Sequence, residues 1–168
     1  MKKKREILTL ALQVGIVVFA CILAGCEPDK TCRQEMNVTA GVTLRGLQVD
    51  STGKATEFAS WDSITVQGVG NDSVLYDNKL SVTQLQLPLR SDTDVTAFTL
   101  MWHETTETLY IHHDNTQRFV SMACGCAVFH TIDSVWFSGT WIDSVKIINS
   151  AVETVKQENI KLYTTLEN

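Results

Sequence analysis

The sequence has few of the residues and none of the short motifs that mark the common catalytic and cofactor sites. Its 168 residues include four histidines and five cysteines. They contain no Gly-x-Ser-x-Gly, His-Glu-x-x-His, phosphate-loop or EF-hand pattern, and no Cys-x-x-Cys pair. We therefore predict no cofactor, no metal ion and no catalytic residue from the motifs that these protein classes share.

Proline and positive charge are also scarce. Proline occurs only at positions 28 and 88, so almost all of the chain is free to join backbone ladders. Residues 1–25 hold four of the 14 basic residues and one of the 19 acidic residues, so the remainder carries a net charge of −8. This acidic balance argues against nucleic acid, and against anionic lipid headgroups, as electrostatic partners.

The N-terminal segment has the composition of an export signal. A basic cluster, Lys2–Arg5, precedes an apolar run that ends in Leu23-Ala24-Gly25-Cys26. These last four residues resemble the lipobox of Gram-negative bacterial lipoproteins, so we predict cleavage after residue 25 and a diacylglycerol thioether on Cys26. The alternative is an uncleaved transmembrane anchor, because the run is just long enough to span a bilayer.

The predicted signal sets the organisation and the location of the rest. Residues 26–35 are polar and include Pro28, which indicates a short lipidated tether, and residues 36–168 are expected to form a single domain. Glu27-Pro28-Asp29-Lys30 is only weakly acidic, whereas surface-exported lipoproteins tend to carry a denser acidic run at this place. We expect an outer-membrane lipid anchor with the domain in the periplasm.

Three cysteines remain after the signal and the lipid-bearing residue: Cys32, Cys124 and Cys126. In an exported protein they can form one disulfide and leave one thiol. Cys124 and Cys126 flank a single glycine, and a bond between them along a strand would be strained. We expect Cys32 to pair with one of these two. The alternative is a redox or soft-metal site formed by Cys124, Cys126 and His130.

From Met36 onward the pattern is that of β-strands. Apolar and polar residues alternate, and Gly68–Asp72 is a turn signal. Pro88 predicts an edge strand or a strand end, and Ser150–Asn159 is expected to be a loop or a single turn. The fold class is all-β, an antiparallel β-sandwich, immunoglobulin-like or similar. The alternating rows are Val38–Leu44, Ile64–Val66, Leu85–Leu89, Phe98–Trp102, Leu109–His113, Cys126–Ile132, Ile142–Ile147 and Ile160–Leu162.

A hairpin is predicted between the fourth and fifth of these rows. Its turn residues are expected to be Thr105 and Thr106, which places Glu104 and Glu107 at a polar, solvated end. His103 then lies about 14 Å or more from His112-His113, too far to share one metal ion.

Adjacent histidines on a strand point to opposite faces. We therefore expect His112 to be solvated and His113 to be hydrogen-bonded within the apolar row. The same pairing places the two residues opposite Thr99 and Phe98 on the preceding strand.

Four stretches resemble an uncharacterised family of small Bacteroidetes lipoproteins that share a domain of unknown function. They are Asp62–Asn78, Leu87–Leu89, Phe119–Gly125 and Ile142–Val145. In that family a cysteine shortly after the lipid site accompanies the one at the position of Cys124. The resemblance therefore implies a Cys32–Cys124 disulfide. The extra thiol of Cys126 is expected to be reduced and buried.

Serine follows aspartate more often than chance predicts. Of ten aspartates, six precede a hydroxyl residue, and five of these form Asp-Ser followed by Thr, Ile or Val. The pattern resembles the acceptor motif of the general O-glycosylation system of Bacteroidetes, although Asp-Ser before a β-branched residue is also a natural strand start. The candidate sites are Ser51, Ser63, Ser73, Ser134 and Ser144.

These observations favour a non-enzymatic envelope lipoprotein that binds an envelope protein or a glycan. A metal- or redox-handling periplasmic module that uses Cys124, Cys126 and His130 is the second hypothesis. An enzyme of another type is the third, because a fold does not fix a function.

Overall fold

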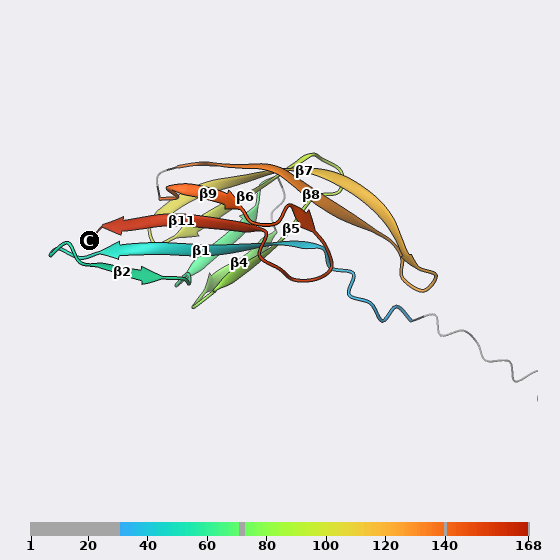
Figure 1. Ribbon diagram of the computed structural model, residues 1–168, viewed down its shortest axis with the longest axis horizontal. Coiled ribbons are helices and arrows are strands. Elements are labelled where there is room, and N and C mark those ends of the chain that lie inside the picture. The colour runs from blue at the N-terminus through green and yellow to red at the C-terminus, as the bar shows by residue number, and fades with distance from the viewer. Residues whose placement is uncertain (1–30, 71–72, 140, 168) are drawn as a thin grey trace, which may run out of the picture. The chain divides into compact units, whose positions relative to one another are not determined.

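The computed structural model describes residues 31–70, 73–139 and 141–167 (Figure 1). In this part of the chain the regular structure consists of strands, and none of it is helical. No helix of the described residues is therefore long and apolar enough to cross a membrane. The predicted signal, the predicted lipid-bearing Cys26 and residues 26–30 of the predicted tether lie outside the described residues.

The strands form two sheets. In chain order they are β1 (Thr39–Val49), β2 (Ala55–Phe58), β3 (Ile64–Gly68), β4 (Val74–Lys79), β5 (Gln84–Pro88), β6 (Val95–Trp102), β7 (Thr105–Ser121), β8 (Gly125–Ser138), β9 (Ser144–Ile147), β10 (Ala151–Val152) and β11 (Ile160–Glu167). One sheet has the order β2-β1-β11-β9, with β5 also paired to β1. The other has the order β10-β8-β7-β6-β3-β4.

The long strand β1 organises the first sheet. Its first half pairs with β5, its second half pairs with β2, and β11 runs along its other side. The β1–β11 ladder is parallel, from Val42–Ile160 to Val49–Glu167, within a sandwich that we predicted as antiparallel. The two strands are more than a hundred residues apart in sequence, so no hairpin forces them to run in opposite directions.

The core lies between the two sheets and confirms the predicted all-β, sandwich-like fold. It contains inward-facing side chains from both sheets, including Val42, Leu44 and Leu162 of the first and Leu100 and Ile111 of the second. The buried and less buried residues alternate along β6, as the period of two requires. Strand β5 ends at Pro88, as predicted. The prediction of a loop or single turn over Ser150–Asn159 is correct for residues 153–159, but Ala151–Val152 form the short strand β10, because they pair with β8.

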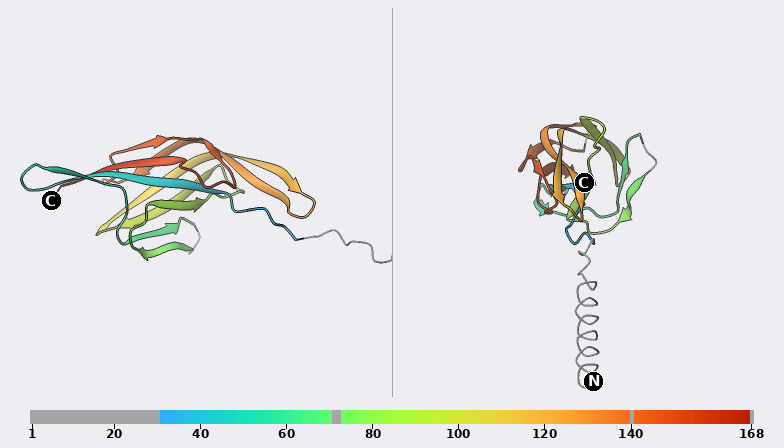
Figure 2. Two further views of the ribbon diagram at one scale, coloured as in Figure 1. Left: turned by 60° about the horizontal axis from the view of Figure 1, so that its bottom comes forward. Right: turned by 90° about the vertical axis from the view of Figure 1, so that its right-hand side faces the viewer.

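The β7–β8 hairpin extends beyond the sandwich as a two-stranded ribbon (Figures 1 and 2). The ladder between β6 and β7 ends at His112, and a register shift follows between His112 and His113. From Asp114 to Phe129, most side chains are exposed or half-buried, because no second layer covers this part. The bulge therefore marks the base of the ribbon.

Candidate functional site

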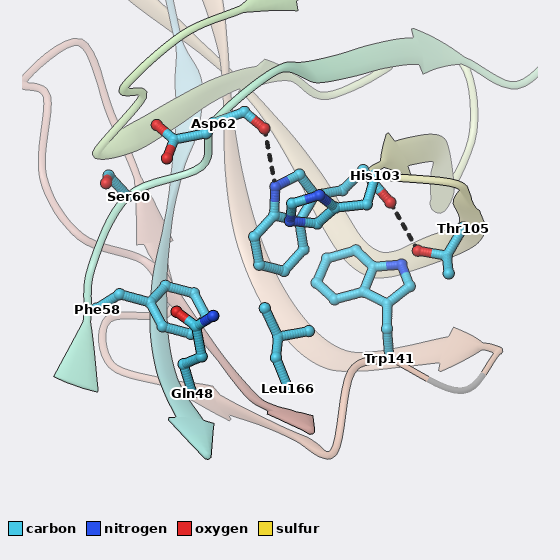
Figure 3. A pocket seen from close by; sticks show the side chains of 9 residues that line it. Gln48, Phe58, Ser60, Asp62, His103, Thr105, Trp141 and Leu166 are labelled. Atoms are coloured by element: carbon cyan, nitrogen blue, oxygen red, sulfur yellow. Dashed lines mark hydrogen bonds between the residues drawn. The ribbon is translucent and has the colours of Figure 1, made fainter. Parts of the chain in front are cut away.

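A hollow opens at one end of the sandwich, between the edges of the two sheets. We call it the mouth pocket (Figure 3). Its volume is about 490 Å³, which is in the range of small-molecule sites. Its lining comes from β1, β2, the β2–β3 segment, the β6–β7 hairpin, the segment before β9 and the end of β11. The residues are Gln48, Phe58, Ser60, Asp62, Trp102, His103, Thr105, Trp141 and Leu166.

Three aromatic rings form the apolar part of the mouth pocket. The ring centroids of Trp102 and Trp141 lie 5.2 Å apart in an edge-to-face arrangement, and those of Phe58 and Trp102 lie 5.8 Å apart. Both tryptophans are buried. The indole of Trp102 donates to the backbone oxygen of Asp62 at 3.0 Å, which fixes its ring plane. The pocket thus has a rigid aromatic floor, while Gln48, Asp62, His103 and Thr105 are exposed at its rim.

Phe58 lines both the mouth pocket and a second hollow of about 340 Å³ along β1, β2 and β11. Its position depends on Gly46, its cross-strand partner on β1. A Cβ atom at position 46 would lie 2.0 Å from the Phe58 ring, so the ring lies directly on the glycine backbone. Only glycine allows Phe58 to cover β1 in this way.

A buried carboxylate holds Trp141 in the pocket wall. Oε2 of Glu107 accepts hydrogen bonds from the backbone N–H groups of Trp141 and Ile142, at 3.3 and 3.0 Å. Oε1 is buried and has no hydrogen-bond partner among the described residues. Burial raises the pKa of Glu107 because it removes water from the charged form, and the two backbone donors only partly oppose this shift.

The expectation that Glu107 is solvated is therefore wrong. The hairpin turns at His103-Glu104 and not at Thr105-Thr106, since Trp102 pairs with Thr105. This turn lies two residues earlier than predicted, so Glu107 sits opposite Leu100, inside the ladder and on the inward face. His103 adopts φ +52, a left-handed conformation that the prediction did not assign to it.

Two buried histidines form a hydrogen-bond network at the base of the ribbon. Nε2 of His113 lies 2.8 Å from Oγ1 of Thr96, and Nδ1 lies 3.0 Å from Oδ1 of Asn115. Nδ1 of His130 lies 2.7 Å from the same Asn115 oxygen. Because an amide oxygen only accepts, both histidines donate from Nδ1. Burial lowers the pKa of His113, and burial together with His113 lowers that of His130 to about 4.

This network confirms the prediction that His113 is hydrogen-bonded within the apolar row. The prediction that His112 is solvated is only partly correct. His112 pairs with Val95, not Thr99, because the turn lies earlier. It is half-buried, and its ring nitrogens lie 3.1 and 3.9 Å from carboxylate oxygens of Asp133 and Asp94. His103 lies at the opposite end of β6, so the structure does not bring these histidines together.

The three cysteines do not share one site. Cys32 and Cys124 are each disulfide-bonded, and Cys126 is a free, exposed thiol. The expectation that Cys126 is buried is wrong, because it lies on the ribbon, where no second sheet covers it. His130 is four residues further along β8, about 13 Å at the rise of a strand. Among the described residues, no cluster of histidine, cysteine or acidic side chains is suited to a metal ion.

All five candidate serines are exposed. Ser51 follows β1, Ser63 and Ser73 directly precede β3 and β4, and Ser144 begins β9. Ser134 differs from the expected loop–strand junction, because it lies within β8 and pairs with His112. Ser63, Ser73 and Ser144 lie at the strand starts that the Asp-Ser pattern predicted, whereas Ser51 lies in the β1–β2 turn.

The sequence indicated Trp102 as a core residue but gave no sign of the mouth pocket. Phe58, Trp141 and Glu107 belong to no alternating row, and only the arrangement of several strand ends brings them together.

The comparisons with known proteins support the prediction that the chain contains a domain of unknown function. Residues 63–164 match the model of a family of unknown function, DUF6452, a range that begins just before β3 and ends within β11. No curated protein and no solved structure matches the chain. Because the matched residues make up more than half of the sequence, the chain belongs to this family of unknown function.

Proposed function

We propose that this chain is a lipid-anchored outer-membrane protein of the Bacteroidetes envelope, facing the periplasm, and that it is a non-enzymatic binding module. The basic start, the apolar run and Leu23-Ala24-Gly25-Cys26 support export and acylation of Cys26. Several acyl chains bind a membrane firmly, at about 0.8 kcal/mol for each buried CH₂ group. A disulfide between Cys32 and Cys124 is part of this proposal, since both are disulfide-bonded.

The mouth pocket is the proposed binding site, and a neutral glycan is the proposed ligand. The observation that carries this proposal is the combination of an aromatic floor and a polar rim. Sugar rings place their C–H faces on aromatic rings and their hydroxyls against amide, carboxylate and hydroxyl groups. The rim offers such groups on Gln48, Asp62 and Thr105. Asp62 and the acidic balance of the chain disfavour an anionic glycan.

The pocket proposal is tested by titrating the purified protein with neutral hexose and N-acetylhexosamine oligosaccharides while tryptophan emission is recorded. Trp102 and Trp141 lie in the pocket, so bound sugar should change their emission. We expect the Q48A/H103N variant to bind more weakly; asparagine tolerates the positive φ of His103. The matched control is Q117A, an exposed glutamine on the ribbon.

Two outcomes would contradict the pocket proposal. One is that no oligosaccharide of the panel changes the tryptophan emission, while affinity capture from solubilised envelope yields a protein that binds through the rim of the mouth pocket. The other is equal affinity of Q48A/H103N and Q117A for a sugar that does bind.

The anchor is tested by intact mass measurement and cell fractionation. We expect a mass that lacks residues 1–25 and gains acyl chains, and loss of both changes in C26A. Protease added to intact cells should leave the protein whole if it faces the periplasm. Digestion under these conditions would place it on the cell surface instead.

A further inference from the structure

The tip of the β7–β8 ribbon is uncharged in an otherwise acidic protein. From Phe119 to Phe129 the chain has no acidic or basic residue. Phe119 is 63% exposed and Met122, in the turn, is 93% exposed. An exposed apolar patch without charge indicates a contact surface, because water is a poor solvent for it.

Along the two ribbon strands, the charged residue nearest to this tip is Arg118, and it is held on the body side. The guanidinium carbon of Arg118 lies 4.5 Å from the centroid of the Phe129 ring. The same side chain lies 3.3 Å from Oε1 of Glu153, which follows β10. Both contacts direct the Arg118 side chain along the ribbon toward the sandwich. The tip beyond Arg118 therefore has an apolar, uncharged surface.

The ribbon projects toward the end of the sandwich at which the chain enters β1. Figures 1 and 2 show residues 33–38 leaving the sandwich on this side, while the β1–β2 turn lies at the opposite end. Residues 33–38 therefore lie on the side of the ribbon tip, and the proposed anchor on Cys26 precedes them in the sequence.

Chain length limits how far the tip can be from that anchor. Cys32 is six residues after Cys26, and six extended residues span about 20 Å. Cys124 lies in the turn at the ribbon tip, two residues from Met122. With the proposed Cys32–Cys124 bond, the tip stays within about 20 Å of the acylated cysteine, plus the length of the bridge.

We propose that the ribbon tip, through Phe119 and Met122, inserts into the lipid bilayer that holds the acyl chains. This inference rests on the proposed lipid anchor. The tip and the acyl chains then form two contacts with one membrane, and they fix the orientation of the sandwich with the mouth pocket pointing away from the bilayer.

The experiment uses full-length, lipidated protein in phosphatidylethanolamine vesicles that contain a small share of spin-labelled lipid. A polarity-sensitive dye is attached to the native free thiol of Cys126, which pairs with Phe119 across the ribbon. We expect the spin-labelled lipid to quench this dye and soluble iodide to be excluded from it. In C126S/S51C the dye sits in the β1–β2 turn, and the opposite result is expected.

The F119S/M122S variant should remain on the vesicles through its acyl chains, but its dye at Cys126 should become accessible to iodide. The matched control is L80S/V155S, which removes two exposed apolar residues outside the ribbon, 69% and 67% exposed. This control should retain the shielding of wild type.

Two results would overturn the tip contact alone: equal iodide access at positions 126 and 51 in a vesicle-bound protein, or F119S/M122S behaving as L80S/V155S. Protein that lacks acyl chains by mass and does not float with vesicles would overturn the proposed anchor, and the tip contact with it.

Discussion

Replacing Glu107 should destabilise both the fold and the mouth pocket. The side chain is 1% exposed. One of its oxygens accepts hydrogen bonds from the backbone N–H groups of Trp141 and Ile142, and these two bonds hold Trp141 in place. In E107A these two donors are left buried without an acceptor, and a small cavity opens. At about 1–3 kcal/mol for each unsatisfied group, we expect the free energy of unfolding to fall by about 3–6 kcal/mol in total.

The E107Q variant separates the hydrogen bonds from the charge. Its amide oxygen still accepts from Trp141 or Ile142, but it does not ionise. The pKa of Glu107 is raised in the folded chain, so the folded state binds more protons than the unfolded state between the two pKa values. The free energy of unfolding of wild type therefore falls as pH rises from the pKa of Glu107 in the unfolded chain, about 4.3, through its pKa in the folded chain. The stability of E107Q relative to wild type should rise over the same window.

The assay is urea unfolding of the soluble chain from residue 27, followed by tryptophan emission at a series of pH values. E104Q and E104A are the matched controls, because Glu104 is exposed in the adjacent turn. The reasoning is refuted if E107A unfolds at the same urea concentration as E104A. It is also refuted if the stability difference between E107Q and wild type does not change with pH.

Three further predictions concern other parts of the chain. The pKa of His130 is lowered to about 4, so the stability that neutral His130 contributes should be lost as pH falls from about 6.5 through 4. The H130N variant cannot take up this proton and should therefore unfold at a lower pH than wild type. An acid unfolding midpoint equal to that of wild type would count against this prediction. Peptide mapping without reduction should link Cys32 to Cys124 and find Cys126 alkylated, whereas a Cys32–Cys126 peptide would disprove the pairing. Intact mass of protein from the native host should show hexose-type increments on one or more of the five Asp-Ser serines, and a mass of polypeptide plus lipid alone would exclude them.

Local alternation was enough to predict most of the strands and much of the core, but not the short strands β2 and β10. Rows such as Phe98–Trp102 and Ile160–Leu162 have a large apolar residue at every second position that is buried in the fold, and this period is a property of the extended backbone itself. The turn at Gly68–Gly70 and the end of β5 at Pro88 follow from single residues with restricted or unusual backbone preferences. None of these features depends on which strands become neighbours.

Only the tertiary structure decided the features that depend on such neighbours. Cys126, the first residue of the alternating row Cys126–Ile132, was predicted to be buried, yet it is exposed because the opposing sheet does not reach the ribbon. Glu107 is buried because the turn forms at His103-Glu104, and a shift of two residues is invisible in the alternation. Phe58 and Trp141 both line the mouth pocket because distant strand ends converge there. The sequence specifies which face of a strand is apolar, and the extent of each sheet determines where that face meets another layer and where it meets solvent.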